Sequence, residues 1–211
     1  MFSEFAEVSS ATWGVIVALL LVGVVVFAVS KDKKRWTARM LANGALCIAL
    51  STVLSFITLY KMPQGGSITL ASMLPMFLFA YAYGVGPGML VGAAYGFVQF
   101  LQGGLYFVHP VELLLDYPLA FAMLGLAGLS NKFSDQWGMI PGIILGTFGR
   151  FVCAFLSGLI FFGMYAPEGQ NVVIYSMVYN GLYLVPEAII CIVLAMIPQI
   201  RHLAKRLALQ D

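Results

Sequence analysis

Three ionisable side chains have the spacing of a shared chemical site. His109, Glu112 and Asp116 occupy positions i, i+3 and i+7, which puts them on one face if the segment that begins at Pro110 is helical. One hypothesis is an intramembrane hydrolase that holds a metal ion with this set. A zinc site needs further ligands, however, and the other histidine, His202, lies in the C-terminal tail. We therefore expect no metal site and no enzymatic activity.

Asp116 has a second possible role, as the anchor of an organic ligand. A charge inside a bilayer costs at least about 2.5–3.5 kcal/mol, so it is retained for a reason. Tyr106 and Tyr117 flank this acid, and Asn180 follows on the last apolar stretch within a stripe of tyrosines at every fourth residue: Tyr175, Tyr179 and Tyr183. A carboxylate among aromatic rings suits a flat ligand that is cationic or donates hydrogen bonds. The alternative is a belt of interfacial tyrosines near the lipid headgroups.

Two further charges fall near the middle of apolar stretches. Arg150 and Glu187 are opposite in sign and at similar depth, so we expect them to neutralise one another as a structural ion pair. A rival hypothesis joins both residues with Asp116 in the proton relay of a stand-alone, proton-coupled transporter.

The elements that must position these residues are membrane-spanning helices. The chain has 211 residues, of which 61% are hydrophobic and 9% charged, whereas soluble domains have about 25% charged residues. A helix needs about 20 apolar residues to cross a bilayer. Seven such stretches occur, near residues 13–30, 40–60, 68–84, 86–104, 110–130, 139–163 and 171–198. Because these runs are continuous, they favour an all-α integral membrane protein over a barrel of alternating strands.

Basic residues predict the orientation of these helices. Five of the 11 lysines and arginines lie between residues 31 and 39, and three between 201 and 206; basic loops stay in the cytoplasm. We expect the N-terminus outside the cell membrane and the C-terminus in the cytoplasm. Residues 1–39 would form an anchor helix, at 12–30, with a basic cytoplasmic loop, and residues 40–211 the functional six-helix domain.

The sequence does not indicate binding of nucleotides or nucleic acids. It has no phosphate-binding loop of the type Gly-xxxx-Gly-Lys-Ser/Thr. Its net charge of +2 reflects the topology rather than a basic binding surface. If ATP drives transport, another subunit must bind it.

Small residues at every fourth position predict sites of close helix packing. One series is Gly88, Gly92 and Gly96, and another is Ala45 and Ala49. Such residues let a neighbouring backbone approach, either within the bundle or from another membrane protein. The pattern leaves both possibilities open.

Several ordered motifs carry a resemblance to a known family. They are Pro63-Gln-Gly-Gly-Ser-Ile-Thr-Leu70, Leu74-Pro-Met76, the segment from Tyr106 to Phe121, and Leu124-Gly-Leu-Ala-Gly128. Over about residues 40–205 the chain resembles the thiamine-specific substrate-binding subunit, or S-component, of energy-coupling-factor transporters. The resemblance implies six helices that bind the vitamin near the outer face. It also implies a transmembrane coupling subunit and two ATPase subunits as partners, so that ATP is used by the partners and this chain binds no cofactor.

The resemblance assigns roles to the candidate binding residues. Asp116 matches the carboxylate that holds the aminopyrimidine, and Tyr106 lines the same pocket. Tyr175 and Asn180 match an ordered pair on the last helix, while Phe162 stands in place of a stacking tryptophan. Ala154 replaces a histidine, which leaves thiamine and its close precursors as candidate ligands, with His109 supplying polarity from another helix.

Two surfaces receive a role from the same resemblance. The polar segment from Met62 to Ile68 would be a lid, in which Pro63, Gly65 and Gly66 form the loop and Gln64 contacts the ligand. Ala45 and Ala49 would dock the coupling subunit.

Overall fold

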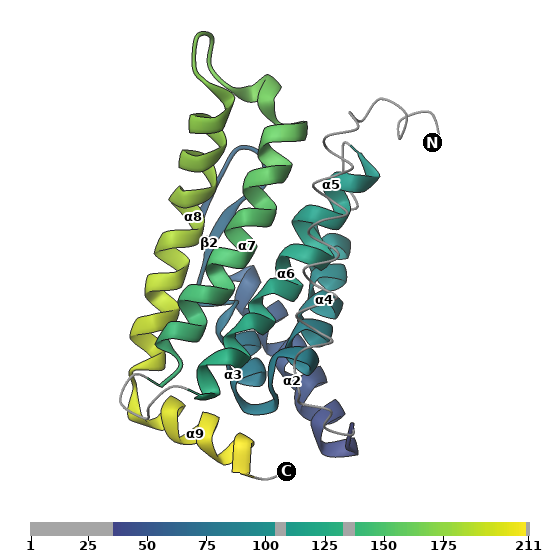
Figure 1. Ribbon diagram of the computed structural model, residues 1–211, viewed down its shortest axis with the longest axis vertical. Coiled ribbons are helices and arrows are strands. Elements are labelled where there is room, and N and C mark those ends of the chain that lie inside the picture. The colour runs from purple at the N-terminus through teal and green to yellow at the C-terminus, as the bar shows by residue number, and fades with distance from the viewer. Residues whose placement is uncertain (1–35, 104–108, 133–137, 210–211) are drawn as a thin grey trace.

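The computed structural model describes residues 36–103, 109–132 and 138–209 and forms one elongated helical bundle (Figure 1). The predicted anchor helix at 12–30 and the predicted pocket residue Tyr106 lie outside these residues. Within the described ranges, four helical segments are long and apolar enough to cross a membrane: Ala38–Phe56, Pro110–Ser130, Ile140–Phe161 and Val172–Ala195. The predicted fold class, an all-α membrane protein, is confirmed.

From the N-terminal side, the described residues form a series of helices and one β-hairpin. They are α2 (Ala38–Phe56), β1 (Thr58–Lys61), β2 (Ser67–Thr69), α3 (Leu74–Tyr83), α4 (Val85–Gln102), α5 (Pro110–Leu114), η2 (Leu115–Leu119), α6 (Ala120–Ala122), η3 (Met123–Lys132), α7 (Ile140–Phe161), η4 (Gly163–Tyr165), α8 (Val172–Ala195) and α9 (Pro198–Leu209).

A β-hairpin replaces the expected end of one helix and the start of the next. The expected helix at 40–60 stops at Phe56, and β1 then pairs antiparallel with β2, with Thr58 opposite Thr69. The Met62 N–H donates to the Gly66 carbonyl at 2.7 Å, which closes the turn. Gly65 has a φ of +102°, a conformation that glycine adopts without steric cost. The polar segment is therefore the tip of a hairpin rather than an irregular loop.

The segment from Pro110 to Lys132 changes its helical form three times. Pro118 lies inside the π-helical turn η2; because proline has no N–H, it cannot donate a bond to the preceding turn, and the helix widens there. The chain then tightens into the 3-10 helix η3. Asp116 is thereby positioned in the irregular turn rather than in a regular helix.

Glycines on α4 pack inside the bundle. A side chain at Gly88 would meet the Ala80 Cβ at 2.6 Å, and one at Gly96 would meet the Tyr117 carbonyl oxygen at 2.5 Å. These close approaches resolve the open alternative for this series in favour of internal packing. The whole of α3 is buried, and it packs against α2, α4, η3 and α9.

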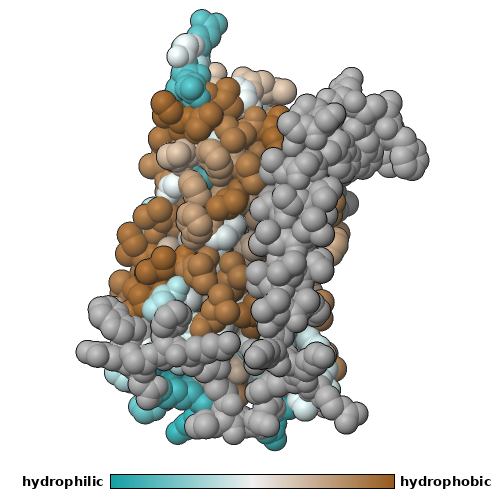
Figure 2. All heavy atoms as spheres, in the orientation of Figure 1, coloured by the Kyte–Doolittle hydropathy of each residue, from teal (hydrophilic) through white to brown (hydrophobic). Residues whose placement is uncertain are grey.

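The two ends of the bundle differ in what they carry. The antiparallel helices α7 and α8 reach a loop at one end, which we call the loop end, and α5 begins there too (Figure 1). At the other end α9, which was not among the expected helices, lies across the bundle. Hydrophilic residues gather at these two ends, with a hydrophobic band between them (Figure 2). This division is the one expected of a chain that spans a bilayer.

Candidate functional site

His109 and Glu112 build the start of α5 at the loop end. The His109 Nδ1 atom accepts a hydrogen bond from the Val111 N–H at 3.1 Å, while the Glu112 carboxylate accepts one from the His109 N–H at 3.2 Å. This reciprocal pair is a capping box, which satisfies N–H groups that the first turn leaves unpaired. The i, i+3 spacing of these two residues therefore has a structural cause, and the contact between His109 and a ligand stays a prediction.

The Asp116 carboxylate lies in the π-helical turn η2, which follows α5. Its Oδ2 atom accepts a hydrogen bond of 2.8 Å from the hydroxyl of Ser157, a fully buried residue of α7. Asp116 itself is partly exposed. In the part of the chain that the structure describes, Ser157 is the one hydrogen-bond donor to this carboxylate, which has room for about four. Asp116 is thus oriented by Ser157, and its role as the anchor of a ligand stays a prediction.

Aromatic rings gather around this end of α7. The Phe161 ring stacks on His109 with a centroid distance of 5.2 Å, and Phe162, at the C-terminus of α7, lies 6.0 Å from Tyr165. Phe162 and Tyr175 are both partly buried, as a residue that lines an accessible site would be. Phe161 was not among the predicted site residues, because adjacent phenylalanines at a helix end give no indication of which one faces inward.

Asn180 joins α7 to α8. Its amide nitrogen donates to the Ala154 carbonyl at 3.2 Å and to the Ser176 carbonyl at 2.9 Å, and its Oδ1 atom accepts from the Tyr183 hydroxyl at 2.9 Å. The residue is 5% exposed. Its amide is therefore engaged in helix packing in this conformation, and its predicted contact with a ligand remains a prediction.

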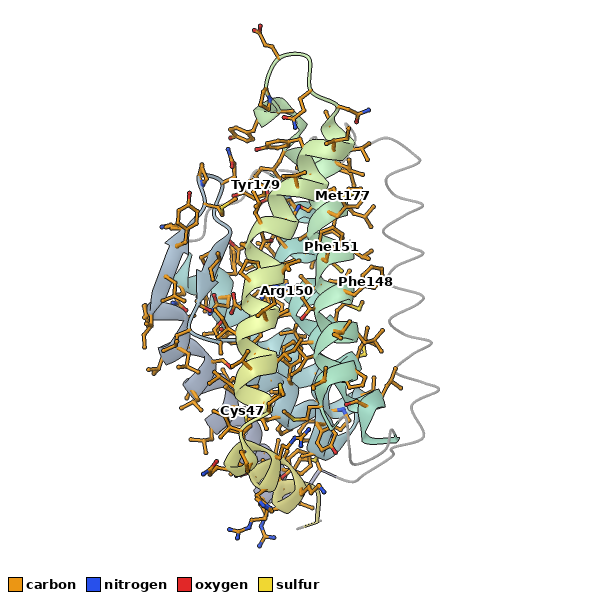
Figure 3. All side chains as sticks on the ribbon, turned by 90° about the vertical axis from the view of Figure 1, so that its left-hand side faces the viewer. Cys47, Phe148, Arg150, Phe151, Met177 and Tyr179 are labelled. Carbon is orange, nitrogen blue, oxygen red and sulfur yellow. The ribbon has the colours of Figure 1, made fainter. Side chains whose placement is uncertain are left out.

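The tyrosine stripe on α8 holds the hairpin. The Tyr179 hydroxyl accepts a hydrogen bond of 3.0 Å from the Gln64 N–H, and a side chain added at Gly66 would lie 2.7 Å from the Tyr183 ring. Tyr179 lies on α8 close to the loop end (Figure 3). Of the predicted lid residues, Pro63 and Gly65 are exposed, whereas Gln64 and Gly66 are partly buried. The hairpin tip thus rests on two of the three tyrosines.

Replacing Tyr179 with phenylalanine tests this attachment. Tyr179→Phe keeps the ring but removes the acceptor for the Gln64 N–H, so amide hydrogen exchange at the hairpin tip should become about fivefold faster, as expected from the loss of a bond worth about 1 kcal/mol. Tyr175→Phe, one turn away on the same helix, is the matched control and should leave the exchange rates unchanged. Equal rates in both variants would show that the hydroxyl does not hold the hairpin.

The base of the hairpin has a second attachment, at Glu187. This side chain is 2% exposed, and its Oε1 atom accepts hydrogen bonds from the hydroxyls of Thr69 at 2.5 Å and Ser72 at 2.8 Å. Arg150 instead lies over the Phe121 ring, with its guanidinium carbon 4.0 Å from the ring centroid.

These contacts correct the predicted ion pair between Arg150 and Glu187. Within residues 36–103, 109–132 and 138–209, no ion pair joins the two side chains, although Glu187 is buried and Arg150 is partly buried. Glu187 obtains its compensation from hydroxyls and Arg150 from an aromatic face, which is a cation–π contact.

Ala45 and Ala49 lie on the exposed side of α2. Large hydrophobic side chains beside them are exposed as well, including Leu46 at 64% and Leu50 at 50%. Only 17% of the apolar window of α2 is buried in the bundle. This helix thus presents a continuous apolar face to lipid or to another membrane protein.

Several helices that are apolar and long enough to cross a bilayer define a multi-pass membrane protein. The comparison with known sequences identifies the kind. The chain belongs to the thiamine transporter protein family (Thia_YuaJ), whose sequence model matches residues 41–207. The family predicted from the ordered motifs is confirmed.

Individual relatives are similar over most of the chain. The thiamine transporter ThiT of Bacillus subtilis (strain 168) is 36% identical over 160 residues, which cover 70% of this chain and 83% of that protein. The thiamine transporter ThiT of Lacticaseibacillus paracasei is 32% identical over 123 residues, which cover 52% and 61%. A solved structure of ThiT from Listeria monocytogenes superposes with a TM-score of 0.66 at 26% identity, covering 79% of this chain and 93% of that one.

Proposed function

We propose that this chain is the S-component of an energy-coupling-factor transporter, which captures thiamine at the outer face of the cell membrane. The observation that carries the proposal is the Asp116 carboxylate, which Ser157 orients inside an apolar bundle. Membership of a thiamine transporter family supports the choice of ligand. The proposed role is binding and delivery, without catalysis and without a cofactor bound by this chain.

The chemistry of thiamine fits this end of the bundle. Thiamine combines a cationic thiazolium ring with an aminopyrimidine, whose amino group donates hydrogen bonds. A carboxylate in apolar surroundings accepts such bonds strongly and balances the positive charge. Phe162 and Tyr175 offer ring faces for stacking, and Tyr106 and His109 complete the proposed pocket.

The hairpin is the proposed lid. Its tip, from Met62 to Ile68, contacts α8 through the hydrogen bond to Tyr179 and through Met62, which packs with Tyr183 and Leu184. Lys61, Pro63 and Gly65 are exposed, and a segment held by few buried side chains opens at low free-energy cost. In the proposed cycle the tip lifts from the tyrosine stripe to admit thiamine, and Gln64 then closes over the ligand.

Delivery into the cell requires partners in this proposal. The exposed small residues Ala45 and Ala49 on α2 would let a helix of the coupling subunit approach closely. Two ATPase subunits on the cytoplasmic side would supply the energy. The basic segments at 31–39 and 201–206 support a cytoplasmic C-terminus and an N-terminus outside.

Ligand titration and reconstituted uptake test the proposal together. Quenching of the intrinsic fluorescence of the purified chain reports ligand binding. We expect thiamine to bind with a lower dissociation constant than thiamine monophosphate or a pyrimidine precursor. Vesicles that also contain the coupling subunit and both ATPases should accumulate thiamine only with internal ATP. Uptake by this chain alone that collapses with the proton gradient would instead favour a stand-alone proton-coupled transporter.

A further inference from the structure

The β-hairpin depends on α8 for its stability. An isolated two-stranded hairpin is marginally stable at best, and every residue of β1 is exposed. One face of α8 carries the contacts that hold the hairpin, because Tyr179, Tyr183 and Glu187 recur at every fourth residue. Tyr179 binds the tip, Tyr183 packs with Met62, and Glu187 binds the root, which we define as residues 69–72. One helix thus holds the hairpin at three levels.

The root is the strongest of these attachments. The hydroxyls of Thr69 and Ser72 both donate to the same carboxyl oxygen of Glu187, and the two hydroxyl oxygens lie 2.7 Å apart. Thr69, Ser72 and Glu187 are buried, with 3%, 5% and 2% of their surfaces exposed. Buried hydrogen bonds to a carboxylate are stronger than a single bond between a backbone N–H and a tyrosine hydroxyl, which is what holds the tip. The tip should therefore detach more readily than the root.

The backbone of the root adopts a conformation that needs such support. Ala71 has a φ of +57°, in the left-handed region that residues other than glycine rarely adopt. Its N–H donates to the Thr69 carbonyl at 2.9 Å, its carbonyl accepts from the Leu74 N–H at 2.9 Å, and the residue is 1% exposed. Strained turns of this kind persist where the surrounding structure holds them, and they are frequent at ligand clamps. The bonds from Thr69 and Ser72 to Glu187 lie on either side of this turn and hold it in place.

We propose that Glu187 is the positioning residue of the lid: it fixes the root on α8, so that the hairpin opens at its tip alone and closes again about a fixed pivot. This inference rests on the proposed capture of thiamine under the hairpin. A fixed root leaves the open hairpin few conformations, which lowers the entropic cost of closing over the ligand. Thiamine leaves when the lid opens, so a loosened root should raise the dissociation rate and leave the association rate nearly unchanged.

Hydrogen exchange of the full chain in detergent, without ligand, tests whether Glu187 fixes the root. Glu187→Leu replaces the acceptor with an apolar side chain, so the amides of Leu70, Ala71 and Ser72 should exchange about tenfold faster. Amides at the tip should keep their rates, because Tyr179 still holds them. Glu187→Gln keeps a carbonyl oxygen that can accept both hydroxyl bonds, so its rates should lie between those of the wild type and Glu187→Leu. Unchanged exchange at the root in Glu187→Leu, or an equal increase along the whole hairpin, would overturn the proposal.

Stopped-flow measurement of thiamine binding tests the link to release. Glu187→Leu should release thiamine about tenfold faster, with the association rate and the melting temperature of the wild type, whereas a general loss of stability would lower the melting temperature. Thr69→Val removes one of the two donors and should release thiamine about fivefold faster; it decides both measurements where Glu187→Leu does not fold. Thr147→Val is the matched control, because this buried threonine of α7 has a hydroxyl without a hydrogen-bond partner in the described ranges.

The outcomes separate this inference from the proposed function. Release at the wild-type rate in both Glu187→Leu and Thr69→Val would show that the root does not control the lid, and an equal acceleration in Thr147→Val would show that any buried change does so. A wild-type chain that binds no thiamine would contradict the proposed function. In that case the exchange rates at the root would still decide whether Glu187 fixes the hairpin.

Discussion

Asp116→Asn should weaken thiamine binding by about a hundredfold or more, because it removes the partner of a cationic, hydrogen-bond-donating ligand in an apolar site. Asparagine has nearly the same shape as aspartate, and its carbonyl oxygen can still accept the 2.8 Å hydrogen bond from Ser157. The substitution therefore changes charge while preserving packing. Titration of the purified variant with thiamine, with the melting temperature recorded in parallel, measures the effect.

Two further variants separate the role of this carboxylate from a general effect of charge. Glu168→Gln removes an exposed acid from the loop between α7 and α8, near the same end, and should not alter binding. Ser157→Ala leaves the charge in place but removes the group that orients it, so thiamine binding should weaken about fivefold. If Asp116→Asn binds thiamine as tightly as the wild type, the carboxylate is not the anchor and the proposed site is wrong.

The course of the helices could be predicted because the bilayer fixes their length and composition. Long apolar runs leave few alternatives to membrane helices. Both ends of α7 lie within two residues of the expected range 139–163, and α8 begins within two residues of the expected range 171–198 but ends three residues before its end. The hairpin was missed because its strands are only three and four residues long, so that pairing across the turn, rather than local propensity, determines them. The irregular turn around Asp116 depends on Pro118, which is visible in the sequence, although the widening it causes depends on the surrounding packing.

Site residues could be predicted where a charged side chain has a high free-energy cost in lipid. They could not be predicted where their role depends only on which way the side chain points after the helices pack. The cost of a buried charge indicates that Asp116 needs a reason to be there, whereas Ser157 resembles any small residue of an apolar helix until α7 is placed against η2. Likewise, depth alone suggested that Arg150 and Glu187 would meet. The rotation of α7 and α8 instead directs Glu187 to the base of the hairpin and Arg150 to Phe121.

The exposed face of α2 yields the second prediction with a large effect. Ala45→Trp and Ala49→Trp should each reduce ATP-driven thiamine uptake by about tenfold or more in vesicles with the coupling subunit, because a bulky ring prevents the close approach that small residues permit. Both positions are exposed in the isolated chain, so their replacement should not disturb its core. Thiamine titration of the purified variants should therefore give the wild-type affinity.

A third tryptophan on the same helix shows whether the effect belongs to the alanine face. Leu50 is 50% exposed and points about 140° away from Ala45 and about 100° away from Ala49, so Leu50→Trp should allow uptake close to that of the wild type. Loss of uptake in all three variants would indicate that α2 tolerates no bulk anywhere, without a specific docking face. Normal uptake in both alanine variants would place the contact with the coupling subunit on another helix. A loss confined to Ala45→Trp and Ala49→Trp, with binding intact, separates capture at the loop end from delivery through a partner held on α2.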